Sequence, residues 1–302
     1  MVRFARPAFR WLLAIVAIAL STCHAWGQSA FSPPFWEVRS GNNTVYLFGT
    51  IHVGKADFYP LPSKIDSAFL DSDVLALEVD PANQQEAVMA MMSAMYTPPD
   101  NIENHLAPAL LSSVAEVSAG YGLPFEQIRQ MKPYLLMFTL TALEYQRLGY
   151  SAAQGLENHL SQRARSEGKR VVALESMLGQ MQMLDSLSPK LQSDMLQITV
   201  DEIANAEVAR LVAAMIEAWR TGNVGTLENV LTVEERRLSD SMANEFHERF
   251  LTERNVKMAQ QLERMLADGE RAFVAVGAMH MVGDDGIPAI LAKQGYQVTP
   301  LH

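Results

Sequence analysis

The chain has 302 residues, of which 49% are hydrophobic and 19% charged, and it carries one cysteine and a formal net charge of −10. This composition excludes extensive disorder, a disulfide scaffold, a four-cysteine zinc site and an iron–sulfur cluster. The acidic balance argues against nucleic acid or an anionic membrane surface as the main partner, and the length suits one large domain or two small ones.

The N-terminal segment has the order of a secretory signal. A basic start is followed by a short apolar run at 11–20 and by small residues around Cys23. The run is about half the ~20 residues that a membrane-spanning helix needs, and no later segment is apolar enough to span. We predict cleavage after Ala25, or else after Ala30, and export to the periplasm or the medium. The alternatives are an uncleaved anchor and a lipoprotein attached through Cys23. Loss of residues 1–25 removes three arginines and no acidic residue, so the net charge becomes −13.

The remaining chain is predicted to alternate between strands and helices. Strands are expected at 35–39, 44–48, 74–80, 170–174, 271–276 and 296–300. Helices are expected over 60–70, most of 81–192, 191–220, 233–266 and 287–293. This order predicts an α/β (α+β) fold, in which a central mixed β-sheet built from N- and C-terminal strands is flanked by helices. We expect a single domain over 26–302, with a large helical insertion at about 81–266.

Two apolar strands each run into a Gly-x-x-His sequence, which ends at His52 near the start of the chain and at His280 near its end. Residues that follow strands are held by a rigid scaffold, and glycine lets the backbone approach a ligand closely. Two such histidines from distant strands could therefore meet at one edge of a sheet. The alternative is a pair of turn histidines with ordinary hydrogen bonds.

Glu78 is a third candidate, because it falls within a predicted apolar strand. A carboxylate inside a buried strand is costly unless it is paired or bound to a metal. Two histidines and one carboxylate form a common ligand set for a divalent metal with open water positions, and such a metal lowers the pKa of bound water. On a half-exposed strand, Glu78 would face solvent instead.

Several short blocks of sequence, spread from about residue 35 to the end, carry a resemblance to a known family. They lie at 46–54 (YLFGTIHVG), 75–80 (LALEVD), 155–157 (GLE), 173–176 (ALES), 254–255 (RN) and 273–280 (FVAVGAMH). In these blocks the chain resembles the TraB/GumN family, which is related to the Tiki-type metalloproteases and more distantly to the erythromycin-esterase-like hydrolases.

The resemblance implies an exported metal-dependent hydrolase that acts on a peptide or ester bond of a peptide or small-molecule substrate. It implies a metal centre of His52, His280 and Glu78, holding Mn²⁺, Co²⁺ or Zn²⁺. Met279 stands where many relatives carry a glycine, and this larger side chain could narrow the site.

Four further residues are candidates for catalysis. Glu175 and Glu157 could transfer a proton, Arg254 could bind a substrate carboxylate or an oxyanion, and Asn255 could orient a ligand. Each also has a structural explanation. Glu175 could form an ion pair, Glu157 could favour the dipole at a helix start, and the other two could lie on a solvated helix face.

Two other functions fit parts of the sequence. The same cleft could serve a non-catalytic accessory protein that binds a peptide or a sugar-derived ligand. The chain also has 17 methionines, several of them clustered at 89–95 and 177–183. Thioethers suit copper(I), although methionine also fills irregular cores.

Overall fold

The computed structural model describes residues 31–301, apart from the side chains of residues 231, 233 and 234. Ser32–His302 form one compact unit. The predicted signal segment, with Cys23, lies outside the described residues. No helix in the described range combines the length and the apolar character that crossing a membrane requires.

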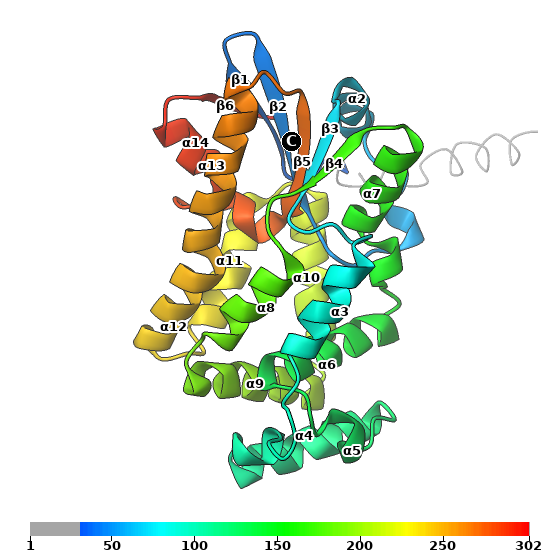
Figure 1. The fold of residues 1–302 in the computed structure, drawn as a ribbon, viewed down its shortest axis with the longest axis vertical. Helices are drawn as coiled ribbons and strands as arrows, with labels where there is room; N and C mark the ends of the chain where they lie inside the picture. Colours follow the sequence, from blue (N-terminus) through cyan, green and yellow to red (C-terminus); the bar gives the residue numbers. More distant parts are fainter. Residues whose placement is uncertain (1–30, 302) are drawn as a thin grey trace, which may run out of the picture. The chain divides into compact units, whose positions relative to one another are not determined.

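One mixed sheet of six strands organises the described residues, which confirms the predicted fold class (Figure 1). Its strands, in the order in which they lie side by side, are β4 (Arg170–Ala173), β3 (Val74–Leu77), β5 (Ala272–Gly277), β2 (Asn43–Thr50), β1 (Phe35–Ser40) and β6 (Gln297–Pro300). The first four are parallel neighbours, whereas β1 is antiparallel to both β2 and β6. The carboxyl ends of four adjacent strands therefore meet at one edge.

The central strands β3 and β5 are buried along their whole length. A parallel sheet covered on both faces favours continuous apolar runs over alternation, and both strands have such runs. The predicted strand at 74–80 was too long, because β3 ends at Leu77. Glu78 is therefore the first residue beyond the strand, and its burial comes from the sheet edge.

Helices cover both faces of the sheet (Figure 1). On one face, α13 (Glu253–Ala267) and α14 (Ile287–Lys293) pack on an apolar layer that joins Val45 and Val274 to Leu262. On the other face, Phe69 of α2 (Ser63–Asp71) packs edge-on against Phe273 of β5. Next to α2, α7 (Leu156–Ser166) contacts β3 and β4.

Most of the other helices lie beyond the carboxyl ends of the parallel strands (Figure 1). They are α3 (Gln84–Ser93), α4 (Pro108–Gly120), α5 (Phe125–Ile128), α6 (Pro133–Arg147), α8 (Met177–Asp185), α9 (Pro189–Ala204), α10 (Val208–Arg220), α11 (Val224–Glu235) and α12 (Asp240–His247). Four short 3₁₀ segments complete the described elements, namely η1 (Ala56–Phe58), η2 (Ile102–Asn104), η3 (Ala152–Gln154) and η5 (Ala278–Met281).

Both long predicted helices are interrupted. The first divides into α9 and α10 at Ala206, whose φ is +56°. The second divides into α11, α12 and α13, and a π-helical turn, η4 (Glu248–Thr252), leads into α13. None of these breaks carries a glycine or a proline, so the sequence lacked the residues that usually signal them. The π-helical turn ends two residues before Arg254, which lies in the first turn of α13.

Candidate active site

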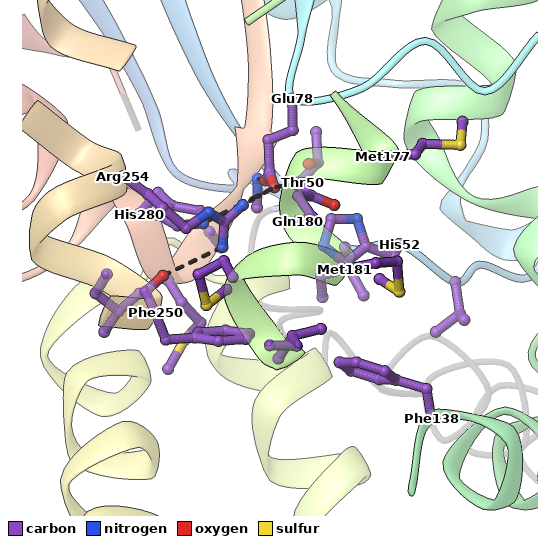
Figure 2. A pocket seen from close by; sticks show the side chains of 18 of the residues that line it. Thr50, His52, Glu78, Phe138, Met177, Gln180, Met181, Phe250, Arg254 and His280 are labelled. Carbon is purple, nitrogen blue, oxygen red and sulfur yellow. Dashed lines mark hydrogen bonds and ion pairs between the residues drawn. The ribbon is translucent and has the colours of Figure 1, made fainter. Parts of the chain in front are cut away.

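Each of the four parallel strands delivers one ionisable side chain just past its carboxyl end. His52 follows β2, Glu78 follows β3, Glu175 follows β4, and His280 lies in η5 after β5. Ligands of open sheets commonly bind at such an edge. The structure therefore brings the two Gly-x-x-His histidines close to Glu78 (Figure 2), and Arg254 joins Glu175 to Glu78.

Glu78 is buried and accepts hydrogen bonds on both carboxylate oxygens. The Gly277 backbone N–H donates to Oε1 over 2.6 Å, and Arg254 Nη2 donates to Oε2 over 2.8 Å. Burial alone would raise the pKa of Glu78, but the nearby His280, His52 and Arg254 together lower it to about 2. Glu78 is thus a buried, paired carboxylate, and the alternative of a solvent-facing strand residue is wrong.

Gly277 lies directly beneath the site. A Cβ atom at this position would stand 3.0 Å from Glu78 Oε1 and 3.4 Å from His52 Nε2. Both atoms therefore lie close to the same point, and glycine, which has no Cβ atom, suits this close approach.

Both histidines are anchored through Nδ1. His52 Nδ1 lies 2.9 Å from Oε1 of Glu157, in the first turn of α7, and that oxygen also accepts from Thr50 Oγ1 over 2.5 Å. His280 Nδ1 lies 2.6 Å from Asn255 Oδ1.

The orientation of Asn255 fixes the tautomer of His280. Asn255 Nδ2 donates to the backbone carbonyl of Asp285 over 2.9 Å, so its Oδ1 acts as an acceptor and His280 Nδ1 carries the proton. The unprotonated Nε2 of His280 then lies 3.8 Å from Glu78 Oε2.

The two histidines have opposite electrostatic environments. The carboxylate of Glu157 raises the pKa of His52, although the ring is 68% exposed and solvent weakens this attraction. Burial lowers the pKa of His280 to about 4, because its ring is only 5% exposed. His280 is therefore neutral at pH 7, which leaves Nε2 as a free electron-pair donor.

Arg254 connects the two strand carboxylates. Besides its bond to Glu78, it donates to Glu175 Oε2 over 2.6 Å from Nη2 and to the Phe250 carbonyl over 3.1 Å. Gln180 also donates to Glu175 Oε2, over 2.9 Å. The alternative of a solvated helix face is wrong for this part of α13, since Arg254 and Asn255 are both buried. Glu175 forms an ion pair with Arg254, which is the structural alternative that the sequence offered for it.

The side chains at this edge offer nitrogen and oxygen donors. Within residues 31–301, no three His, Cys, Asp or Glu side chains form a group that could hold a metal ion as they stand. His280 Nε2 lies 3.8 Å from Glu78 Oε2, His52 Nε2 and Glu78 Oε1 both lie beside Gly277, and each ring is held through its Nδ1 by a second residue. Metal-binding histidines are usually oriented in this way. Nitrogen and oxygen donors without thiolate suit Zn²⁺, Mn²⁺ or Co²⁺.

A cavity of about 600 Å³ opens from this polar cluster. Figure 2 shows polar side chains on one side and apolar side chains, including Met181, Phe250 and Phe138, on the other. Six methionines line it, namely Met91, Met177, Met181, Met183, Met215 and Met279. Four of them, Met91, Met177, Met181 and Met183, belong to the two clusters that the sequence offered as copper ligands or core residues. The contacts of Thr50 were missed, although it lies inside the first Gly-x-x-His sequence.

Comparison with known proteins gives one family match and several relatives. A family model described as the TraB/PrgY/gumN family matches residues 34–300. The chain is 26% identical over 252 residues to the uncharacterized protein YbaP of Escherichia coli K12, covering 83% of this chain and 89% of that protein. It is 21% identical to an uncharacterized protein of Treponema pallidum, over 86% of this chain and 80% of that protein. It is 23% identical over 347 residues to the metalloprotease TIKI1 of Xenopus tropicalis, covering 97% of this chain and 67% of that protein. No solved structure matches the chain significantly.

Proposed function

The chain belongs to the TraB/PrgY/gumN family, and on that premise we propose that it is an exported metal-dependent hydrolase. One observation carries this proposal. The Nδ1 atoms of His52 and His280 are both held by second residues, His280 Nε2 lies 3.8 Å from the buried Glu78 carboxylate, and His52 Nε2 lies with Glu78 Oε1 beside Gly277. The 23% identity to a protein named as a metalloprotease supports the same reaction class.

In this proposal His52, His280 and Glu78 hold the divalent metal. Bound there, the metal would act as a Lewis acid and lower the pKa of a bound water. Glu157 and Asn255 are positioning residues, because each fixes the ring of one histidine. Arg254 holds the carboxylates of Glu78 and Glu175 in place. A role for Glu157 or Glu175 in proton transfer stays a prediction.

Metal titration of the purified protein tests the proposal. We expect one Zn²⁺, Mn²⁺ or Co²⁺ per chain by calorimetry and by elemental analysis, and we expect His52→Ala and His280→Ala to lose that ion. His105→Ala is the matched control, because that histidine pairs with Asp100 in another part of the molecule. Equally low metal content in the wild type and in both site variants would refute a metal centre.

A second candidate is a ligand-binding protein without catalysis. The observation that favours it is that both oxygens of Glu78 already accept hydrogen bonds, one of them from a cation. Such a protein would retain a ligand in the cavity without cutting it. Incubation with metal and a mixture of peptides and esters separates the two functions, since intact retained ligand supports binding and product supports hydrolysis.

Export is the remaining part of the proposal. The basic start and the apolar run of residues 1–25 support it. Cell fractionation and the mass of the mature chain test both export and the cleavage site. A Cys23→Ala variant with an unchanged mass and location would exclude lipid attachment at that residue.

A further inference from the structure

The cavity next to the metal-binding candidates is divided by polarity. Its polar side chains lie at the strand edge, and they are Thr50, His52, Glu78, Gln180, Arg254 and His280. Away from that edge, Tyr145 is the only polar side chain among the described residues that line it. The remaining side chains are those of alanine, valine, leucine, isoleucine, methionine and phenylalanine.

This division bears on what the apolar part can hold. A peptide inserted there would bring an N–H and a C=O group at every residue, and the walls offer almost no side-chain partners for them. Most of the wall comes from helices, whose own backbone groups are already hydrogen-bonded. Burying unpaired amide groups is costly, whereas a hydrocarbon chain carries none.

The size and the lining also suit a hydrocarbon chain. At about 30 Å³ for each water, a cavity of about 600 Å³ holds about 20 water molecules. A methylene group takes up about as much room as one water, so a ten-carbon chain fits with space left for a head group. Methionine side chains are flexible and adapt to a bound chain of variable shape.

Two of the apolar side chains that line the cavity also reach the protein surface. Met91 of α3 and Phe138 of α6 line the cavity and are also 54% and 37% exposed. Beside Met91, Val88 and Met92 on the same helix are 60% and 71% exposed. Exposed apolar side chains gathered in this way mark a surface that meets an apolar partner. We call these four residues the entrance rim.

From these observations we propose that the substrate is an ester or amide of a medium-chain carboxylic acid, with its acyl chain in the cavity and its carbonyl group at the strand edge. This inference rests on the proposed hydrolase function. The reaction is a simple hydrolysis, in which the oxygen of water bonds to the carbonyl carbon and the bond to the leaving oxygen or nitrogen breaks. The leaving atom takes a proton, and the products are a carboxylic acid and an alcohol or amine. The acyl chain enters past the entrance rim.

A chain-length series tests this inference. Metal-loaded protein is assayed with p-nitrophenyl esters of two, four, six, eight and ten carbons. We expect kcat/KM to rise about fourfold for each buried methylene until the cavity is full. A flat or falling series overturns the inference. Measurements below and above the critical micelle concentration of the longer esters show whether the protein hydrolyses single ester molecules or esters in micelles.

Two matched variants test whether the acyl chain of the substrate lies in this cavity. Ala87 lines the cavity on an exposed face of α3, so Ala87→Trp should narrow the cavity while leaving the fold intact. We expect it to lower kcat/KM for the ten-carbon ester at least tenfold and to lower kcat/KM for the two-carbon ester much less. Ala109→Trp, on an exposed face of α4, is the control and should change neither. Equal effects of Ala87→Trp on both esters contradict an acyl chain in this cavity.

A binding assay separates this inference from the proposed function. A dansyl-labelled undecanoate should bind metal-free protein and be displaced by decanol, and Ala87→Trp should weaken it. Binding of the probe without any metal binding would refute the hydrolase and leave the acyl site standing. Metal binding and cleavage of the two-carbon ester without probe binding would refute the acyl site alone. Stronger displacement by apolar peptides than by decanol would also overturn it, in favour of a peptide ligand.

Discussion

Replacing Arg254 with methionine should be among the most destabilising single changes in the described part of the chain. Methionine keeps most of the length and the apolar stem of arginine but removes the positive charge. Arg254 and Glu78 are each about 8% exposed and Glu175 is 15% exposed, and the guanidinium contacts both carboxylates within 2.8 Å. Its loss leaves the buried carboxylate of Glu78 and the partly buried carboxylate of Glu175 side by side without their cation.

The magnitude follows from that burial. Removing one partner of a buried ion pair costs about 3–5 kcal/mol, because the remaining charge stays buried and unpaired. This is a large part of the total free energy of unfolding of a typical domain, which is ~5–15 kcal/mol. Arg271 and Asp73 form an ion pair of similar length, 2.7 Å, but they are 60% and 63% exposed. For that pair we expect almost no loss of stability, because water screens exposed charges.

The free energies of unfolding of Arg254→Met and Arg271→Met are compared by urea unfolding followed by circular dichroism. A chelator is present to remove stray metal ions. Adding Glu175→Gln to Arg254→Met should recover part of the lost stability, since it removes one of the two uncompensated charges. If Arg254→Met costs no more than Arg271→Met, or if Glu175→Gln worsens it, the charge of Arg254 does not stabilise the fold by compensating the two carboxylates.

Three further outcomes are expected. Gly277→Ala should lower the free energy of unfolding by about 1–3 kcal/mol and weaken metal binding, because its Cβ atom would stand 3.0 Å from a carboxylate oxygen. Gly120→Ala, with open space around it, should be neutral or slightly stabilising in the same thermal unfolding experiment. Glu157→Gln should weaken metal binding about 10–100-fold in calorimetry without changing the melting temperature by more than a few degrees, and unchanged affinity would show that it does not support His52. His247 lies between two carboxylates, and its pKa is raised despite the opposing effect of burial. The stability that its charge contributes should be fully present below about pH 6.5 and be lost as the pH rises through its raised pKa, so a constant difference between wild type and His247→Gln from pH 5 to 9 would contradict this pairing.

The sequence determined the sheet and the residues at its edge. Apolar runs bounded by turn residues specify strands locally, and the mixed sheet predicted from them is the one that the structure contains. Because β2, β3, β4 and β5 are parallel, the residues that follow them in sequence, including His52, Glu78 and His280, must meet at one edge. Their convergence therefore depends on short-range patterns, which a single sequence carries, and on the parallel pairing of these strands, which only the structure shows.

Only the tertiary structure decided which groups hold those residues and what lies beside them. Glu157 reaches His52 across 105 positions of sequence, and Arg254 reaches Glu78 across 176. Such pairings depend on where α7 and α13 dock, and the breaks that set the position of α13 carry no glycine or proline to announce them. The apolar cavity arises in the same way, since methionines from separate helices form one wall only when those helices pack together. A local pattern specifies an element and its exposed end, but the packing of distant helices fixes the partners, the charges and the space of the site.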